Sequence, residues 1–333
     1  MIELLAGENE AGCRLDRIVR KRLPLMSLSG IYSLIRKGGV RISGRKLRQD
    51  YRLQKGDRIE IDADVSELAV PDQKQKLDLA RLVHTVFFKR NFKILHEDRD
   101  LIACNKPAGL VVHPGTGHLR RDTLIDLATA YLLSGRKIKG SDDLALVHRL
   151  DRDTSGVILI AKNKPALRRI HESFRNRTLV KQYVAICHHR PPKAEGEVVV
   201  KLVRDRDERG ETRMRISDQA AHGMFSRSVY RLDAYHNGLS KVEVFLETGK
   251  THQIRIHCAH VGAPIVGDDR YGDAALDNEL FSRRSGILRR LYLHAWKLQV
   301  PPPPGLSGGK TLSIKAPLPD EFNGIMEEGA LPR

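Results

Sequence analysis

The stretch LVHRLDRDTSGVILIAKN, residues 146–163, places charged and small residues between two apolar runs. The runs, 144–147 and 157–161, are typical of strands, and Gly156 closes the loop between them. Asp151 stands in this loop between two arginines. A carboxylate flanked by buried strands stays ionised only beside a cation or a polar group. The loop is therefore a candidate site for chemistry.

A second motif, ETGKTHQIRIHCAHVGAPIVGDDRYG at residues 247–272, offers such a cation. The alternation within HQIRIH predicts a strand with Ile254 and Ile256 on one face and Arg255 on the other. An arginine in an apolar strand needs an anion, and the simplest partner is Asp151. The pair fits an ionised nucleophile or base. It fits a structural ion pair equally well, and the spacing does not separate the two.

The charge of the chain is strongly positive and unevenly spread. Its 333 residues carry a formal charge of +17, and its pI is about 9.9. Between residues 14 and 58 there are fourteen Lys and Arg against Asp16, Asp50 and Asp57, so +11 of the total lies there. This excess predicts a polyanionic partner, most simply a nucleic acid.

The basic segment has the pattern of a small folded domain. Its first helix presents an apolar face made of Leu15, Ile18, Val19 and Leu23. A second helix begins after Ser29 as N-cap and ends at Gly38-Gly39. A hairpin with its turn at Ser43-Gly44 follows. A strand then has Ile59 and Ile61 facing inward.

The rest of the chain reads as a linker and a larger β-rich domain. Residues 66–92 are polar and then weakly helical. From Phe92 onward short strand-like runs dominate, with helices predicted only over 123–133 and 164–174. Strands and helices do not alternate, so we expect a mixed, mainly antiparallel sheet with flanking helices, an α+β fold.

Residues 12–64 resemble the S4 RNA-binding domain, in the order LIRKGGVRISGRKL followed by KGDRIEID. The resemblance implies phosphate contacts along one helix and the hairpin, which give affinity with little sequence choice. The candidate RNA-binding residues of this domain are Arg17, Arg36, Lys37, Arg41, Arg45 and Lys46.

HRLDRDTSG, residues 148–156, resembles the signature of the RluA-type pseudouridine synthases. The resemblance extends to NKPAGLVVHPG at 105–115, KQY at 181–183, TGKTHQIRIH at 248–257, PIVGDDRYG at 264–272 and LHA at 293–295. Several members of that family also carry an N-terminal S4 domain. Together the motifs imply an S4 domain at 12–70, a linker at 71–92 and a synthase domain at 93–325.

The resemblance also implies roles for individual residues. Asp151 would be the catalytic aspartate, with Arg255 as its partner. Tyr183 would stack on the target base and is a candidate general base. Arg149 would enter the RNA stack as the uridine flips out, a step that chemistry on a stacked base requires. His148 would contact the RNA or shape the loop, and Thr154 and Gly156 would shape it.

The implied reaction isomerises uridine to pseudouridine in RNA. The N1–C1′ bond breaks, the uracil rotates in place, and C5 bonds to C1′. Whether Asp151 attacks C1′ or assists a glycal route stays open. The reaction implies no cofactor and no metal, and the chain has neither GxGxxG nor GxxxxGK[ST]. DDRYGDAALDNEL at 268–280 is most similar to members that modify large-subunit (23S) rRNA. VVHPG at 111–115 is more similar to another type that also modifies large-subunit rRNA, so the target uridine stays open.

A haloacid-dehalogenase-like phosphatase is an alternative. DRDTSG fits the nucleophile loop DxDxT of that class, with Asp151 as nucleophile and Asp153 as acid. GDDRYGD would supply Asp268 and Asp273 to Mg²⁺. In the favoured interpretation these acids are caps or ion pairs in a turn. A further alternative is a non-catalytic rRNA-binding assembly factor.

A zinc site made of His252, His257 and His260 lacks a fourth ligand at the usual spacing. The four cysteines form no CxxC motif, which fits a reducing cytoplasm. The acidic N-terminus does not resemble a signal peptide. No apolar run approaches the roughly 18 residues of a membrane span. We expect a cytoplasmic monomer whose partner is RNA.

Overall fold

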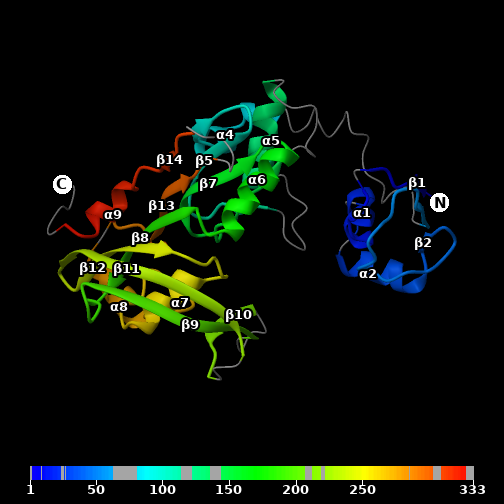
Figure 1. The fold of residues 1–333 in the computed structure, drawn as a ribbon. Coiled ribbons are helices and arrows are strands. Elements are labelled where there is room, and N and C mark those ends of the chain that lie inside the picture. Colours follow the sequence, from blue (N-terminus) through cyan, green and yellow to red (C-terminus); the bar gives the residue numbers. More distant parts are fainter. Residues whose placement is uncertain are drawn as a thin grey trace. The chain divides into compact units, whose positions relative to one another are not determined.

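The computed structural model describes residues 2–8, 10–23, 26, 28–62, 81–113, 122–135, 144–206, 212–218, 222–284, 286–302 and 309–327 (Figure 1). The chain forms two compact units. The smaller contains the described residues up to Leu82 and His113, and the larger contains residues 83–112 and the described residues from 122 onward.

The small unit packs two helices on a three-stranded sheet. Its elements are β1 (Ile2–Leu5), α1 (Leu15–Arg22), α2 (Leu28–Lys37), β2 (Val40–Ile42) and β3 (Arg58–Ile61). The sheet is antiparallel in the order β1-β3-β2. The apolar faces predicted for α1 and β3 are buried, so these elements are confirmed. β1 was not predicted, and its burial alternates residue by residue beside β3.

Backbone conformation sets the ends of these elements. Gly38 has φ +84° and stops α2, as predicted. Ser43 and Gly44 have φ 47° and 77°, which makes the tight hairpin turn that the sequence predicts. The N-cap prediction is wrong, because α2 begins at Leu28 and Ser29 already lies inside the helix.

The large unit is built on one long mixed sheet. Its strands are β4 (Ile94–Glu97), β5 (Leu101–Lys106), β6 (Ala145–Leu146), β7 (Ser155–Ala161), β8 (Val180–His188), β9 (Glu195–Arg206), β10 (Thr212–Ile216), β11 (Met224–His236), β12 (Leu239–Leu246), β13 (Leu293–Val300) and β14 (Leu312–Lys315). Its helices are η2 (Leu82–His84, at the junction of the units), α4 (Val86–Asn91), α5 (Leu124–Ser134), α6 (Lys164–Arg175), α7 (Gln253–His260), α8 (Ala274–Arg283) and α9 (Asp320–Gly324).

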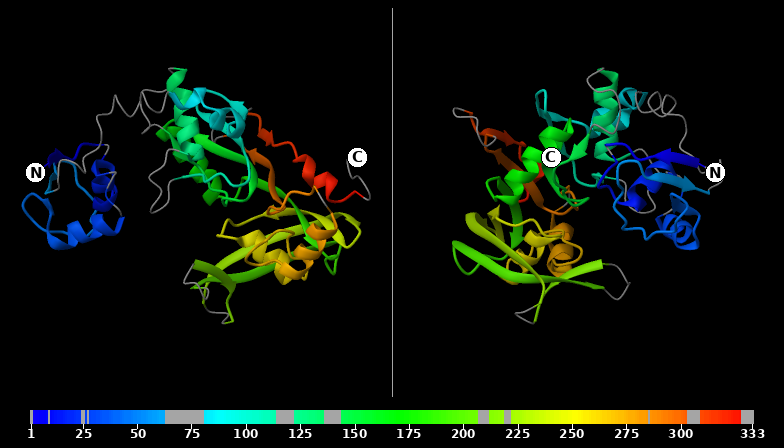
Figure 2. Two further views of the ribbon diagram at one scale, coloured as in Figure 1. Left: turned by 180° about the vertical axis from the view of Figure 1, so that it is seen from behind. Right: turned by 45° about the vertical axis from the view of Figure 1, so that its right-hand side comes forward.

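The strand order is β10-β9-β11-β12-β8-β13-β7-β5-β4, with β14 beside β13 and β6 beside β7. Among the described residues, the strand pairings of this sheet are antiparallel except that of β13 with β7. Helices α5 and α6 lie beside the β4–β5–β7 half, and α7 and α8 lie beside the β9–β12 half (Figures 1 and 2). The predicted α+β class, with a mixed and mainly antiparallel sheet, is confirmed. The parallel contact of β13 with β7 joins the two halves.

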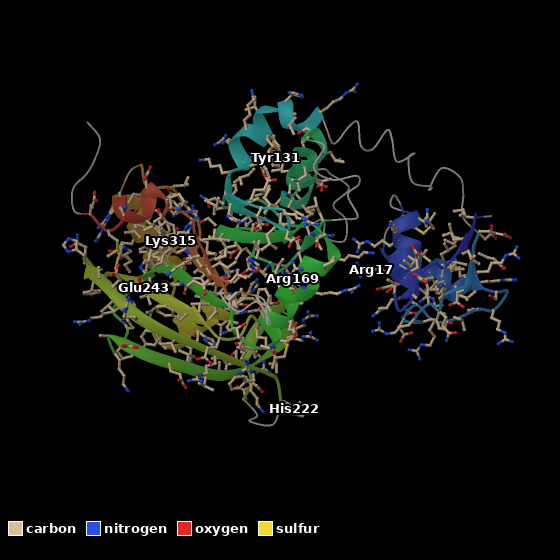
Figure 3. The ribbon with its side chains drawn as sticks, turned by 45° about the horizontal axis from the view of Figure 1, so that its top comes forward. Arg17, Tyr131, Arg169, His222, Glu243 and Lys315 are labelled. Carbon is tan, nitrogen blue, oxygen red and sulfur yellow. The ribbon has the colours of Figure 1, made fainter. Side chains whose placement is uncertain are left out.

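Helices α5 and α6 match the predicted ranges because both carry strong N-terminal caps. Thr123 and Asp126 form a capping box at α5, and the Asn163 side chain accepts the N–H of Ala166 at α6. Tyr131 on α5 donates to Glu97 of β4 at 2.9 Å, which ties that helix to the sheet (Figure 3). The predicted linker at 71–92 lies partly outside the described residues, and its last part forms α4.

The strand predicted over HQIRIH is wrong, because residues 253–260 form helix α7. Side chains on every side of this helix are buried, from Gln253 to Cys258. A segment that is buried all round has no polar face, so its hydrophobic period does not identify it. Among the described residues, every helix is too short or too polar to cross a bilayer.

Candidate active site

Asp151 lies in the loop that leads into β7, and a buried lysine fixes this loop. Lys106, at the end of β5, is fully buried, and its ammonium donates to three carbonyls: Pro107 at 2.9 Å, Leu110 at 2.8 Å and Arg152 at 2.6 Å. Burial lowers the pKa of Lys106 to about 7, although the negative charges of Asp153 and Asp151 raise it. The charged ammonium has three N–H groups, one for each of the three carbonyls. In this form Lys106 holds the backbone of Arg152, the residue after Asp151. The sequence prediction missed Lys106, although a lysine ending the apolar run LIACNK was a signal.

Close backbone packing fixes the other end of the loop. The N–H of Thr154 donates to the carbonyl of Asp151 at 3.2 Å. Gly156 has φ +115°, and a Cβ placed there would lie 2.2 Å from the carbonyl oxygen of Ala295 on β13. The loop-shaping roles predicted for Thr154 and Gly156 fit this geometry. Only glycine lets β7 approach β13 so closely.

Tyr183 lies on β8, and its side chain lines a cavity of about 450 Å³ together with Asp151. The ring is 8% exposed. Burial raises the pKa of Tyr183, and the charge of Asp151 raises it further, so the phenol stays protonated. A cavity of this size holds a flipped nucleotide base with part of its sugar.

The cavity rim is basic. Five lysine or arginine side chains line it: Arg149, Arg177, Lys181, Lys250 and Arg255. The first four form no ion pair with a described residue, and Arg149 and Arg177 are exposed. Free cations around a carboxylate-containing cavity suit a polyanionic substrate that wraps the opening.

Arg255 does not pair with Asp151, which corrects the prediction. From α7 its guanidinium donates to Asp268 at 2.7 Å through Nε and to Asp269 at 2.9 Å through Nη2. Arg255 and Asp268 form a buried bidentate pair, with side chains 7% and 0% exposed. Burial lowers the pKa of Arg255. The hydrogen bond to Asp268 and the charge of that carboxylate raise it, with a contribution from Asp151, and the net shift is upward. Arg255 thus lines the cavity, and its positive charge acts on Asp151 without an ion pair between the two.

His252 lies beside Asp151, where the sequence prediction did not place it. His252 Nε2 lies 3.9 Å from Asp151 Oδ2, and His252 Nδ1 lies 2.9 Å from the hydroxyl of Tyr271. Burial lowers the pKa of His252. The charge of Asp151 raises it, whereas the charges of Arg255 and Arg270 lower it further. The strand expected over 252–257 hid this residue, because a strand would have turned it away from the arginine face.

His148 is placed as a structural residue of the loop. Its Nε2 accepts the backbone N–H of Leu159 at 3.1 Å. Burial, with the charge of Lys181 adding, lowers its pKa to about 4, so the imidazole is neutral. This geometry favours the loop-shaping role over RNA contact. Arg149, next in the chain, is exposed at the rim and remains the candidate to contact RNA.

The acids of residues 267–273 have structural partners, as the favoured interpretation predicted. Asp268 accepts from Arg255 and from the N–H groups of Arg270 and Tyr271, each at 3.0 Å. Asp273 caps α8 through the N–H groups of Ala275 and Leu276. The sheet also lacks the parallel α/β order of the phosphatase class. These features contradict the phosphatase alternative.

The histidines of the zinc alternative are likewise bound elsewhere. His257 Nε2 lies 3.0 Å from the hydroxyl of Ser226, which donates to the carbonyl of Val200, and Nδ1 lies 2.5 Å from that of Ser228. His260 is exposed on the same helix. His257 therefore locks α7 onto β11 as a neutral imidazole, since its pKa falls to about 4 through burial.

His257→Gln is expected to remove much of the fall in unfolding free energy that the wild type shows as the pH is lowered. The unfolded histidine titrates near pH 6.5, and the folded one titrates near 4. Between these values the unfolded state binds more protons, so the wild type loses stability as the pH falls. The difference in unfolding free energy between wild type and variant should shrink by roughly 2 kcal/mol between pH 7.5 and pH 5.

Urea denaturation at the two pH values measures this difference. His260→Gln, on the exposed side of α7, serves as the control and should show no such change. An unchanged difference between pH 7.5 and pH 5 for His257→Gln would contradict a buried neutral imidazole.

In the small unit, the six predicted RNA-binding residues are all exposed, and none forms an ion pair with a described residue. Arg17 lies on α1 (Figure 3), Arg36 and Lys37 end α2, Arg41 lies on β2, and Arg45 and Lys46 follow the turn. Other basic side chains of this unit are neutralised, such as Lys55 by Glu8 and Arg58 by Glu3.

Comparison with known proteins gives one consistent result. The family model "RNA pseudouridylate synthase" matches residues 100–260, and the S4 domain model matches residues 13–59. Ribosomal large subunit pseudouridine synthase C of Escherichia coli K12 is 34% identical over 325 residues, which is 96% of this chain and 94% of that protein. The protein of the same name from Pasteurella multocida is 34% identical over 330 residues, 98% of this chain and 93% of that one.

Solved structures agree with the sequence relatives. Human RNA pseudouridylate synthase domain containing 4 superimposes with a TM-score of 0.56 at 27% identity, over 76% of this chain and 96% of that chain. Human RNA pseudouridylate synthase domain containing 1 gives 0.52 at 25% identity, over 68% and 83%.

Proposed function

The chain belongs to the RNA pseudouridine synthase family, and on that premise we propose that it converts uridine to pseudouridine in the RNA of the large ribosomal subunit, 23S rRNA. The observation that carries the proposal is the shared cavity of Asp151 and Tyr183 inside a rim of unpaired cations. The names of the relatives, which are synthases of the large ribosomal subunit, support the choice of RNA.

The chemistry needs a single ionised carboxylate. The N1–C1′ bond breaks, and Asp151 either takes C1′ as a nucleophile or assists loss of a proton from the sugar. The uracil rotates while it is held, C5 bonds to C1′, and the C5 hydrogen leaves as a proton. Because the base never departs and no water attacks, the second carboxylate of a glycosidase is not required.

Tyr183 and Arg149 have complementary parts in presenting the uridine. A base inside a helix hides its glycosidic bond, so the nucleotide must flip out to reach Asp151. Stacking on the protonated ring of Tyr183 holds the flipped base and is worth about 1–3 kcal/mol. Arg149 is exposed at the cavity rim, where it can fill the gap left in the RNA stack.

The small unit supplies affinity through its six unpaired cations. Replacing Arg36 and Lys37 together by Gln should lower the slope of log affinity against log salt by roughly 1 to 2, because two phosphate contacts are lost. Filter binding to rRNA fragments over a salt series measures the slope. Lys55→Gln removes a cation already paired with Glu8 and is the control. Equal slopes for the double variant and the wild type would contradict phosphate contact by these residues.

The direct test uses rRNA labelled with tritium at uracil C5. Formation of the C5–C1′ bond must expel this label, so its release counts turnovers. We expect release from 23S fragments in the presence of EDTA, and none from small-subunit rRNA or tRNA. Release from tRNA alone would overturn the proposed substrate and keep the reaction. Binding without release from any RNA would favour the assembly-factor alternative.

An rRNA substrate also implies a cytoplasmic protein, and we propose that it acts as a monomer. Size-exclusion chromatography with light scattering should give a mass near 37.5 kDa. A mass of twice that value would contradict the monomer.

A further inference from the structure

We propose that His252 is a positioning residue for Asp151, held in one tautomer by Tyr271; this inference rests on the proposed function. His252 stands directly before α7 with φ 57°, a left-handed conformation that side chains rarely adopt. This backbone directs one ring nitrogen toward Asp151 and the other toward Tyr271. Unusual backbone of this kind persists only where the surroundings enforce it, and it gathers at functional sites.

Tyr271 determines which ring nitrogen carries the proton. The hydroxyl oxygen of Tyr271 already accepts the backbone N–H of Met214 at 3.1 Å. Its own hydrogen is therefore free to donate to His252 Nδ1, 2.9 Å away. With Nδ1 as acceptor, the neutral imidazole carries its proton on Nε2. The opposite tautomer would aim the lone pair of Nε2 at the carboxylate of Asp151, which is unfavourable.

The phenol itself is firmly placed. Two guanidinium groups pack over its ring, that of Arg255 at 5.2 Å and that of Arg213 at 5.3 Å from the ring centre. The backbone N–H of Tyr271 donates to Asp268, the carboxylate that also binds Arg255. Arg255 thereby contributes to the site indirectly, because it helps to hold the ring of Tyr271, which orients His252.

The consequence for Asp151 is a directed N–H donor at its side. Nε2 and Oδ2 are 3.9 Å apart, which a small movement on substrate binding closes to a hydrogen bond. A donor there favours the ionised carboxylate and fixes the direction of its reactive oxygen. The charged groups that act on His252 are Asp151 itself, Arg255, Arg270 and Asp268.

Three substitutions of His252 separate this role from a structural one. His252→Gln places an amide N–H near the position of Nε2, and His252→Asn places one near Nδ1. Asn tolerates the left-handed backbone at least as well as Gln, so a folding effect would not favour Gln. His252→Ala removes both contacts.

The expected activity follows from these geometries. His252→Ala and His252→Asn should lower kcat for tritium release on the order of 10- to 100-fold, as is common for residues that orient a reacting group. KM should change little. In both variants the acidic limb of the pH–rate profile should move to higher pH. His252→Gln should keep most of the activity and the wild-type limb, and Tyr271→Phe should lose several-fold.

The tautomer is measured without any turnover. Long-range ¹H–¹⁵N spectra of the ¹⁵N-histidine-labelled full chain report which nitrogen is protonated, with His252 assigned from its Gln variant. We expect the Nε2–H form in the wild type and a mixture in Tyr271→Phe. An Nδ1–H form, or equal activities of the Gln and Asn variants, would overturn the inference. Absence of tritium release from the wild type, with the Nε2–H form present, would instead overturn the proposed function on which the positioning role rests.

Discussion

Asp151→Asn is expected to lower the rate of tritium release on the order of 10⁴-fold, with little change in RNA affinity. Asparagine has the same shape but no charge, so it can neither form a bond to C1′ nor stabilise positive charge there. A loss of this size is about 5 kcal/mol of transition-state stabilisation. Affinity is expected to persist because it comes from the cations of the rim and of the small unit.

Asp153→Asn is the matched control for this prediction. Asp153 lies two residues away, its side chain is 42% exposed, and its visible partner is the neighbouring Arg152 at 3.0 Å. An exposed pair of this kind contributes at most about 1 kcal/mol. Its loss should change the rate only a few-fold. Single-turnover rates and filter binding on the same RNA fragment compare the two variants. Equal losses for both would contradict the assignment of Asp151 as the only essential carboxylate of the loop.

The parts of the fold that the sequence predicts well are those with one-sided burial. Residues 15–22 form a helix with one buried face, and residues 58–61 alternate in and out, so their periods identify them. Helices α5 and α6 have side-chain caps that mark their starts. In each case a local property of a few adjacent residues determines the element.

Helix α7 shows where such local signals fail. Ile254 and Ile256 alternate with polar residues, but Gln253 and His257 are buried as well, each by a partner from a distant segment. The Gln253 amide donates to the carbonyl of Arg227 at 3.0 Å, and His257 bonds two serines of β11. Tertiary hydrogen bonds thus replace the polar face that an isolated helix would show to water.

The same limit applies to the site. The sequence motifs around Asp151 and Tyr183 predict a shared role for the two residues, and the structure places both in one cavity. The partner of Arg255 could not be predicted in this way, because the sequence offers three carboxylates, those of Asp151, Asp268 and Asp269. Arg255 binds Asp268 and Asp269, which lie in the turn that follows α7 in the chain. His252 then occupies the position beside Asp151.

Gly156→Ala is expected to destabilise the large unit by roughly 3–5 kcal/mol or to prevent its folding. At φ +115° a residue with a Cβ is strained even where there is space for its side chain. Here there is no space either, because the new Cβ would lie 2.2 Å from the carbonyl oxygen and 2.7 Å from the nitrogen of Ala295. These are backbone atoms of the paired strand β13, and they cannot rotate away.

Gly109→Ala isolates the conformational part of this effect. Gly109 also has a positive φ, +82°, and also touches the catalytic loop, since its N–H donates to the carbonyl of Arg152. A Cβ at Gly109 meets no atom within 4 Å, so only the backbone penalty of about 1–2 kcal/mol remains. Urea unfolding and the soluble yield compare the two variants.

Adding Ala295→Gly to Gly156→Ala tests the cause directly. Because the obstacle is the main chain of Ala295 and not its methyl group, the double variant should regain no stability. Recovery in the double variant, or a cost for Gly156→Ala equal to that for Gly109→Ala, would contradict the close approach of β7 and β13. That approach matters for function, because Ser155 and Gly156 follow the loop of Asp151 and pair with His294 and Ala295, and Ala295 pairs on its other side with Tyr183 of β8. A methyl group between these strands should therefore separate the carboxylate from the ring that presents its substrate.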